Sequence, residues 1–262
     1  GFFPNSFYHN SNHACKDSHI DYTLDERVAD LLSLFSREES SIFVDRNKHR
    51  SDPWKDSYTR VTTGKSSARE LLINYACKDP NANLGIEYLY YWENLTIRRP
   101  IDISSGKKLL IFLHVDPECS VNPSSGLEIM THLRFLQMVN SIVPNEWRIF
   151  VKEHPSMFMA AWQRGARGYA LGRSSIFRCY IESVERFAFI PAEMNARDAV
   201  SLVDCTATIR GTASLESILA RKPCLATSSS PINAVPGMID IETLTDFDGA
   251  FMKATKELGL SN

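Results

Sequence analysis

The chain has 262 residues, of which 44% are hydrophobic, and its formal net charge is −2 at pH 7. This length and hydrophobic content allow a sizeable buried core, which argues against global disorder. The small net charge argues against a dedicated nucleic-acid binder, which would carry a basic excess, but it allows a local cationic pocket for a phosphate.

The sequence favours a cytoplasmic protein. No apolar run approaches the roughly 18 residues of a membrane-spanning helix, and no signal-peptide pattern opens the chain. The chain starts at Gly1 without Met, so we interpret it as a processed product or a fragment. Its six cysteines are scattered without a CxxC pair, which is typical of reduced thiols in the cytosol.

The first part of the chain, residues 1–105, predicts a mainly helical N-terminal region. A capping box that begins at Thr23 starts one helix, and Ser66 or Ser67 starts a second helix that reaches towards Trp92. The turn formers that follow, up to the Ser-Ser-Gly stretch before residue 107, mark the boundary of this region.

From Lys108 onwards, apolar strand-like runs alternate with helical patterns. Leu109–Leu113 is continuously apolar, as in a strand of a parallel sheet covered on both faces. Further strands are expected at 147–151, 187–190, 205–209 and 223–226, and helices at 127–141, after Pro155, and at 196–202, 214–220 and 247–258. The alternation predicts an α/β fold, with a Rossmann-like doubly wound parallel sheet at 106–245 and a C-terminal helix within 246–262.

A parallel sheet of this kind binds ligands at the carboxyl ends of its strands, and the tetrapeptide Lys152-Glu153-His154-Pro155 directly follows one strand. His154 can donate a hydrogen bond to a phosphate, and Lys152 can add positive charge. Pro155 fits the first turn of a helix, whose N-terminus attracts anions. The alternative is that His154 only satisfies backbone groups in a strand-to-helix turn.

A second motif follows the expected strand 205–209, with the sequence Gly211-Thr212-Ala213-Ser214-Leu215-Glu216. Gly211 permits a close backbone approach, and the free N–H groups with the hydroxyls of Thr212 and Ser214 form an anion cradle. Glu216, one turn into the helix, is placed to accept hydrogen bonds from ribose hydroxyls. The alternative is an ordinary capping box that binds nothing.

A third motif follows the first strand, with the sequence Asp116-Pro117-Glu118-Cys119-Ser120. A carboxylate at this place can act as a base, a nucleophile or an electrostatic stabiliser. The alternative is a turn-forming Asp-Pro pair.

Three further patterns that could indicate a nucleotide, a metal or a dinucleotide do not match their motifs. We therefore expect no cofactor and no metal. Thr63-Gly64-Lys65-Ser66 resembles the end of a P-loop, but the first glycine of that motif and the preceding strand are missing. The histidines and cysteine between His9 and His19 fit no standard zinc spacing. No GxGxxG occurs, which argues against a dinucleotide.

Three segments occur in order at strand ends, and together they resemble the capsule polysaccharide biosynthesis family, which includes bacterial β-Kdo transferases. They are Leu113-His114-Val115-Asp116-Pro117-Glu118, Val151-Lys152-Glu153-His154-Pro155, and Ile209-Arg210-Gly211-Thr212-Ala213-Ser214-Leu215-Glu216 with Arg221-Lys222-Pro223. The third is similar to the GTxxxEAxxxGKP stretch of that family, and the His-Pro pair also resembles the CMP-phosphate motif of bacterial sialyltransferases. The resemblance covers about residues 106–230.

The resemblance implies a GT-B glycosyltransferase, in which two Rossmann-like domains face each other and the C-terminal one holds a nucleotide sugar. His154, Thr212 and Ser214 would hold the nucleotide phosphate. Glu118, followed two positions later by Ser120, would be the catalytic carboxylate, with Asp116 as the near alternative. The donor would be CMP-linked and Kdo-like, and the acceptor a saccharide or glycolipid, through which the protein would associate peripherally with a membrane.

The sequence departs from that family at Arg221, where glycine is common, and at His114-Val115-Asp116, which replaces a more usual stretch. Residues 1–105 are also short for an acceptor domain and would be part or a remnant of one. Two alternatives stay open. One is a polyol-phosphate transferase or nucleotide-sugar 2-epimerase, and the other is a nucleotide-binding module without activity.

Overall fold

The computed structural model describes residues 82–104, 106–115, 131–155, 157–158, 173–227, 230 and 232–260. Several features predicted from the sequence lie outside these residues: the helix at Thr23, the P-loop-like stretch Thr63–Ser66, the histidines between His9 and His19, and the motif Asp116–Ser120.

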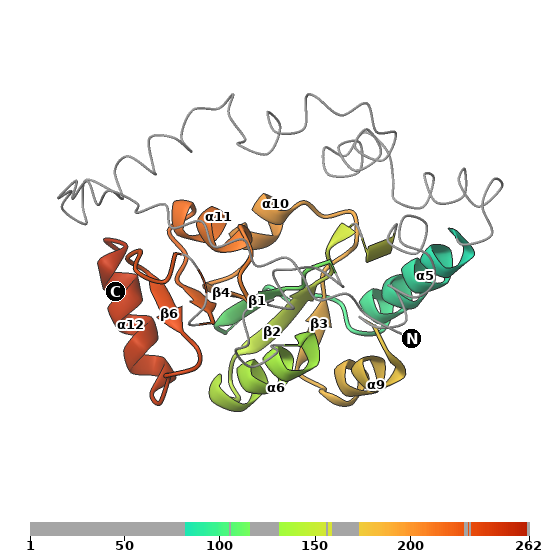
Figure 1. Ribbon diagram of the computed structural model, residues 1–262, viewed down its shortest axis with the longest axis horizontal. Coiled ribbons are helices and arrows are strands. Elements are labelled where there is room, and N and C mark those ends of the chain that lie inside the picture. The colour runs from blue at the N-terminus through green and yellow to red at the C-terminus, as the bar shows by residue number, and fades with distance from the viewer. Residues whose placement is uncertain are drawn as a thin grey trace, which may run out of the picture.

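A six-stranded parallel sheet forms the centre of the described structure (Figure 1). Its strands are β1 (Lys108–Phe112), β2 (Arg148–Lys152), β3 (Phe187–Phe189), β4 (Cys205–Thr208), β5 (Cys224–Ala226) and β6 (Met238–Asp240). They lie in the order β3-β2-β1-β4-β5-β6, so the order reverses between β1 and β4, as in a Rossmann-like sheet. The predicted fold class is confirmed.

The described helices are α5 (Ala82–Arg98), α6 (His132–Ile142), α9 (Ser175–Ser183), α10 (Ala196–Ser201), α11 (Ala213–Leu219) and α12 (Phe247–Glu257). None of them combines the length and the apolar character that crossing a membrane requires. The sequence predicted neither α9 nor β6.

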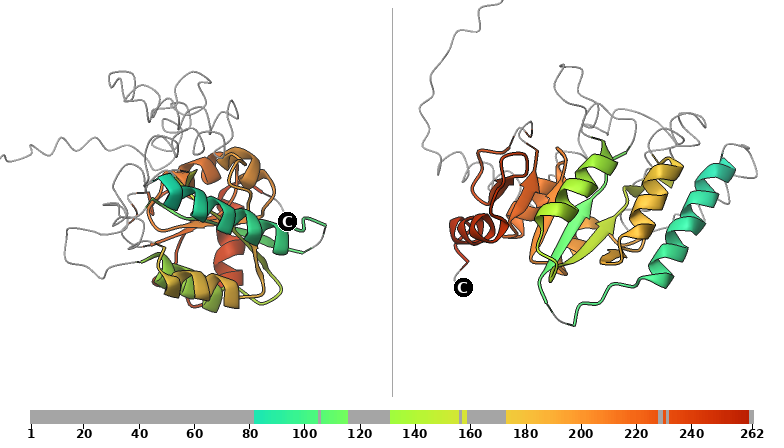
Figure 2. Two further views of the ribbon diagram at one scale, coloured as in Figure 1. Left: turned by 90° about the vertical axis from the view of Figure 1, so that its right-hand side faces the viewer. Right: turned by 90° about the horizontal axis from the view of Figure 1, so that it is seen from below.

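Helices cover both faces of the sheet, which explains why successive residues of its central strands are buried (Figures 1 and 2). Along β1, Leu109 and Ile111 join the core with α5, α6, α9 and α12. Leu110 and Phe112 join the core on the other face, where α10 packs and Ala213 of α11 adds to it.

The helix α5 belongs to this core, although it precedes the boundary predicted near residue 105. Trp92 donates from Nε1 to the carbonyl of Ile190 at 2.8 Å, and its ring meets Phe189 edge-on. Arg99 donates to the carbonyls of Glu182 and Val184 at the end of α9, which lies beside α5 (Figure 2, right). The described segments on both sides of residue 105 therefore pack as one unit.

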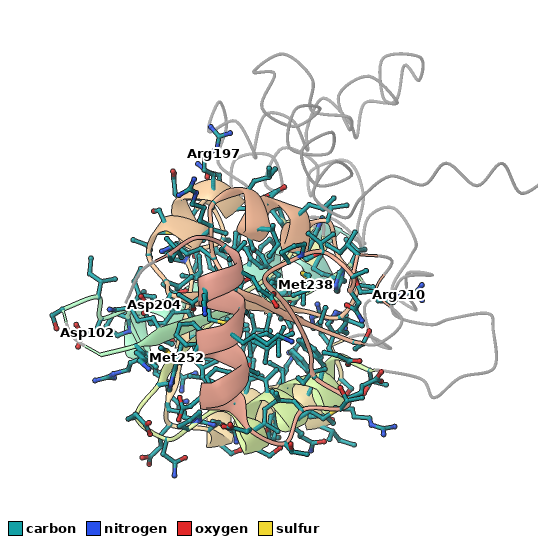
Figure 3. The ribbon with its side chains drawn as sticks, turned by 90° about the vertical axis from the view of Figure 1, so that its left-hand side faces the viewer. Asp102, Arg197, Asp204, Arg210, Met238 and Met252 are labelled. Carbon is teal, nitrogen blue, oxygen red and sulfur yellow. The ribbon has the colours of Figure 1, made fainter. Side chains whose placement is uncertain are left out.

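Two residues that flank β4 mark the amino and the carboxyl edges of the sheet. At the amino edge, Asp204 accepts a hydrogen bond from the N–H of Lys108 at 2.8 Å, which ties the starts of β4 and β1 together. Figure 3 shows Asp204, just before β4, and Arg210, just after it, on opposite sides of the molecule. Arg210 thus marks the carboxyl edge, where Rossmann-like sheets bind ligands.

Candidate functional site

Three strands end level with one another at the carboxyl edge. Phe112 of β1 pairs with Lys152 of β2 on one side and with Thr208 of β4 on the other. The segments that follow these residues therefore leave the sheet at the same edge, on both sides of the point where the strand order reverses. Two of the three predicted motifs are brought together in this way.

Lys152 places a buried amine at this edge. Its side chain is 4% exposed, and Nζ donates to the carbonyl of Glu153 at 3.4 Å. Burial lowers the pKa of Lys152 to about 8, against the opposite effect of the negative charges of Glu153 and Glu216. A cation in such a place loses solvation, so an incoming anion would be strongly favoured.

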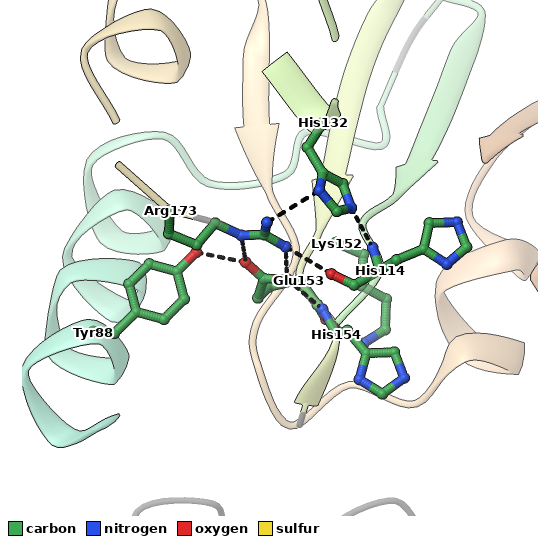
Figure 4. Close-up of polar contacts among 7 residues, drawn as sticks. All are labelled: Tyr88, His114, His132, Lys152, Glu153, His154 and Arg173. Carbon is green, nitrogen blue, oxygen red and sulfur yellow. Dashed lines mark hydrogen bonds and ion pairs between the residues drawn. The ribbon is translucent and has the colours of Figure 1, made fainter. Parts of the chain in front are cut away.

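His154 lies two positions after Lys152, directly before the short helix that begins at Pro155. Burial lowers the pKa of His154 to about 4, the charges of Lys152 and Arg173 act in the same direction, and only Glu153 opposes them. The ring is therefore neutral at pH 7, with one N–H to donate. Figure 4 shows the imidazole pointing to the same side as that of His114, away from Tyr88 and Arg173.

Glu153 has a different position from the one expected of a phosphate-site residue. Its side chain is fully buried and accepts four hydrogen bonds, from Arg173 Nε at 2.7 Å, Arg173 Nη2 at 2.8 Å, the hydroxyl of Tyr88, and the N–H of His154. Burial alone would raise the pKa of Glu153, but the charge and hydrogen bonds of Arg173 outweigh it and lower that pKa. The carboxylate thus points into the protein and holds the turn.

Three residues of this cluster carried no motif in the sequence: His132, Arg173 and Tyr88. The N–H of His114 donates to His132 Nε2 at 2.9 Å, and Arg173 Nη2 donates to the carbonyl of His114 at 2.8 Å. These contacts join segments far apart in the chain, so no local pattern could have identified them.

The imidazole of His114 links the two strands on either side of the reversal point. Its Nε2 lies 2.9 Å from Thr208 Oγ1, and a β-carbon on Gly211 would lie only 2.4 Å from its Cε1. The sequence expectation that Gly211 permits a close approach agrees with this contact. The close partner, however, is His114 of the same chain.

The second motif forms the first turn of α11. Thr212 is its N-cap residue, is exposed, and makes no capping hydrogen bond with its side chain. Among the described residues, the N–H groups of Thr212 and Ala213 have no acceptor. Ser214 is buried, and its hydroxyl donates to the carbonyl of Gly211 at 2.5 Å. Thr212 and Ala213 therefore present donors at the edge, whereas the hydroxyl of Ser214 closes the turn.

The remaining predicted residues are placed as follows. Glu216 lies one turn into α11, exposed, and its charge acts on Lys152. Asp116, Glu118 and Ser120 lie outside the described residues. In the described part of the chain, no group of three or more His, Cys, Asp or Glu side chains is arranged to hold a metal ion.

Comparison with known proteins gives no match to a family model and no match to a curated protein. Among the solved structures that are similar to this chain are two from one organism. One is KpsC of Thermosulfurimonas dismutans, a beta Kdo 2,4 transferase, with 14% identity and a TM-score of 0.37 over 65% of this chain and 54% of that chain. The other is a beta Kdo 2,7 transferase, also KpsC of that organism, with 17% identity and a TM-score of 0.35 over 72% of this chain and 57% of that chain. The chain spans little more than half the length of either protein.

Proposed function

We propose that this chain is the nucleotide-sugar-binding half of a GT-B glycosyltransferase. The enzyme would move a Kdo-like sugar from a CMP-linked donor to a saccharide or glycolipid acceptor in surface or capsular polysaccharide synthesis. One observation carries the proposal. Lys152, His154 and the first turn of α11 leave the sheet at one edge, where the strand order reverses.

The groups at this edge suit a phosphate. Lys152 supplies a positive charge that water does not solvate, and neutral His154 supplies one N–H. The N–H groups of Thr212 and Ala213 add two donors, and the exposed Thr212 hydroxyl adds a third. A hydrogen bond to a charged phosphate contributes about 1.5–3 kcal/mol, so the set is sufficient to bind a nucleotide.

The same groups would also assist the transfer step. When the sugar leaves, negative charge grows on the departing phosphate, and donors already aimed at that phosphate stabilise it without reorganisation. On the sugar side, the resemblance places Glu118 as the carboxylate, with Asp116 as the alternative and Ser120 beside it. Glu216 is assigned to the ribose hydroxyls, and cytidine as the base rests on the His-Pro pair.

Calorimetric titration with CMP, CDP and UDP tests the proposal. We expect CMP to bind more tightly than UDP. Tighter binding of CDP or UDP would instead favour the polyol-phosphate transferase or the 2-epimerase, and binding of none of the three would contradict the proposal. The full-length protein with a CMP-sugar donor then separates an enzyme from a nucleotide-binding module without activity, since only the enzyme releases CMP in the presence of acceptor.

A further inference from the structure

A buried ion pair lies directly behind the proposed phosphate site. The side chains of Arg173 and Glu153 are both fully buried, and Nε lies 2.7 Å from Oε2. Desolvating two charges usually offsets their attraction, so apolar residues would serve stability equally well. The geometry of this pair therefore needs an explanation other than stability.

Arg173 contacts the ends of two strands at once (Figure 4). Its Nη2 donates to the carbonyl of His114, which follows β1, and also to Oε1 of Glu153, which follows β2. The N–H of His114 is held from another direction by Nε2 of His132. One guanidinium thus fixes the spacing between the backbone that carries His114 and the backbone that carries His154.

Glu153 in turn fixes the orientation of the His154 turn. Each carboxylate oxygen accepts two hydrogen bonds: Oε1 from His154 N–H and Arg173 Nη2, and Oε2 from Arg173 Nε and the hydroxyl of Tyr88. Tyr88 comes from α5, far from the other partners in sequence. A carboxylate with four donors has no freedom to turn outwards, and the His154 ring points away from Arg173 and Tyr88 (Figure 4).

We propose that Tyr88, Glu153 and Arg173 are positioning residues for the donor phosphate. They hold the turn after β2 so that the imidazole of His154, and not the carboxylate of Glu153, faces the ligand. They also keep His154 at a fixed spacing from His114. This inference rests on the proposed function, because it assigns the three residues to the same phosphate site.

The mildest test is Tyr88→Phe, because it removes one hydrogen bond and leaves the ion pair intact. Tyr91→Phe is a matched control. Tyr91 lies one turn further along α5, and its hydroxyl donates to Glu182 Oε1 at 2.8 Å, away from the edge. Losing one such hydrogen bond is worth about 0.5–1.5 kcal/mol, so we expect Tyr88→Phe to weaken CMP binding about threefold to tenfold. Tyr91→Phe should leave the affinity unchanged.

A second variant removes the pair without leaving a buried charge. The double substitution Glu153→Met with Arg173→Met should fold, because apolar replacements of buried pairs are often neutral. It should weaken CMP binding by about tenfold or more, since the His154 turn loses its anchor and His154 its hydrogen bond to phosphate. NMR titration of the His154 ring in the nucleotide-free Tyr88→Phe protein, which keeps the charges of Glu153 and Arg173, should also show a changed pKa, whereas Tyr91→Phe should leave that pKa unaltered.

The outcomes separate the two proposals. If the natural chain binds CMP and both Tyr88→Phe and the double variant bind it equally well, the positioning role is wrong and the proposed function stands. If the natural chain binds no nucleotide, the proposed function is wrong. The His154 titration in Tyr88→Phe then decides the positioning role, and an unchanged pKa in that variant overturns it.

Discussion

Gly211 lies so close to the ring of His114 that no other residue fits there. A β-carbon at position 211 would come within 2.4 Å of His114 Cε1 and 2.9 Å of Thr208 Oγ1. Position 211 is not among the residues with positive φ, so close packing and not backbone strain requires this glycine. The contact joins the end of β1 to the segment after β4, at the centre of the proposed site.

Gly211→Ala should therefore destabilise the protein by about 1–3 kcal/mol, the usual cost of overpacking, and should weaken CMP binding by displacing His114. Urea denaturation and calorimetry measure the two effects. Combining Gly211→Ala with His114→Ala should relieve part of the overlap. The double variant should therefore lose less stability than the sum of the losses in the two single variants. Strict additivity would show that the two residues do not press on each other.

The left-handed backbone conformation of Arg221 suggests that a glycine at this position would stabilise the protein. Its φ is 55°, and it follows α11 in a motif where Arg221 N–H bonds to Ile218 O and Lys222 N–H bonds to Ser217 O. This motif favours glycine at the left-handed position. Arg221→Gly should raise the free energy of unfolding by about 1 kcal/mol, as measured by urea denaturation. Arg221→Ala should give no comparable gain, and an equal gain would contradict the backbone explanation.

The lowered pKa of Lys152 leads us to expect opposite pH dependences for CMP binding and for protein stability. Its pKa in the folded protein is about 8, below the ordinary value of 10.5. Phosphate binding needs the charged amine, so CMP affinity should fall as the pH rises above about 8. Between about pH 8 and 10.5 the unfolded chain binds this proton better than the folded one, so the free energy of unfolding should rise there with pH.

Lys152→Met is the control for both dependences. The apolar side chain suits the buried position, and it should lower CMP affinity at neutral pH and remove both the fall in affinity and the rise in stability. Calorimetry and urea denaturation between about pH 7 and 10 follow the two quantities. An alkaline fall in affinity that persists in Lys152→Met would assign the titration to another group.

Glu118→Gln tests the proposed role of Glu118 as the catalytic carboxylate in the full-length protein. The substitution keeps the shape and removes the charge, so CMP binding should stay nearly intact while transfer falls by orders of magnitude, since the transition state alone loses stabilisation. Sugar transfer from a CMP-linked donor is the measurement. Normal turnover in Glu118→Gln together with lost turnover in Asp116→Asn would exchange the roles of these two residues.

The sheet could largely be predicted from the sequence, because its strands are buried on both faces and read as apolar runs. The run Leu109–Leu113 covers β1 (Lys108–Phe112) except for its first residue. In contrast, β6 (Met238–Asp240) has only three residues, and its pairing with β5 depends on tertiary context. The helix α9 was not predicted: it buries only Phe177 and Ile181, and the neighbouring Ile176 is exposed.

The candidate site could be predicted only where a residue lies at the end of its strand or within a few residues after it. Lys152 and Gly211 were identified in this way, and both lie at the expected edge. The inward orientation of Glu153 could not be predicted, because it depends on Arg173 and Tyr88, which lie 20 and 65 residues away in the chain. Likewise, the Ser214 hydroxyl donates within its own turn, and a sequence pattern does not distinguish that contact from binding a ligand.

Calorimetric titration of His154→Ala with CMP tests the central claim most directly. His154 is at the edge near Lys152, and its neutral ring carries one N–H, whose hydrogen bond to a charged phosphate would be worth about 1.5–3 kcal/mol. The substitution should therefore weaken CMP binding by about tenfold or more, while urea denaturation shows that the variant is folded. A folded His154→Ala protein that binds CMP as tightly as the natural chain would contradict the placement of the donor phosphate at this edge.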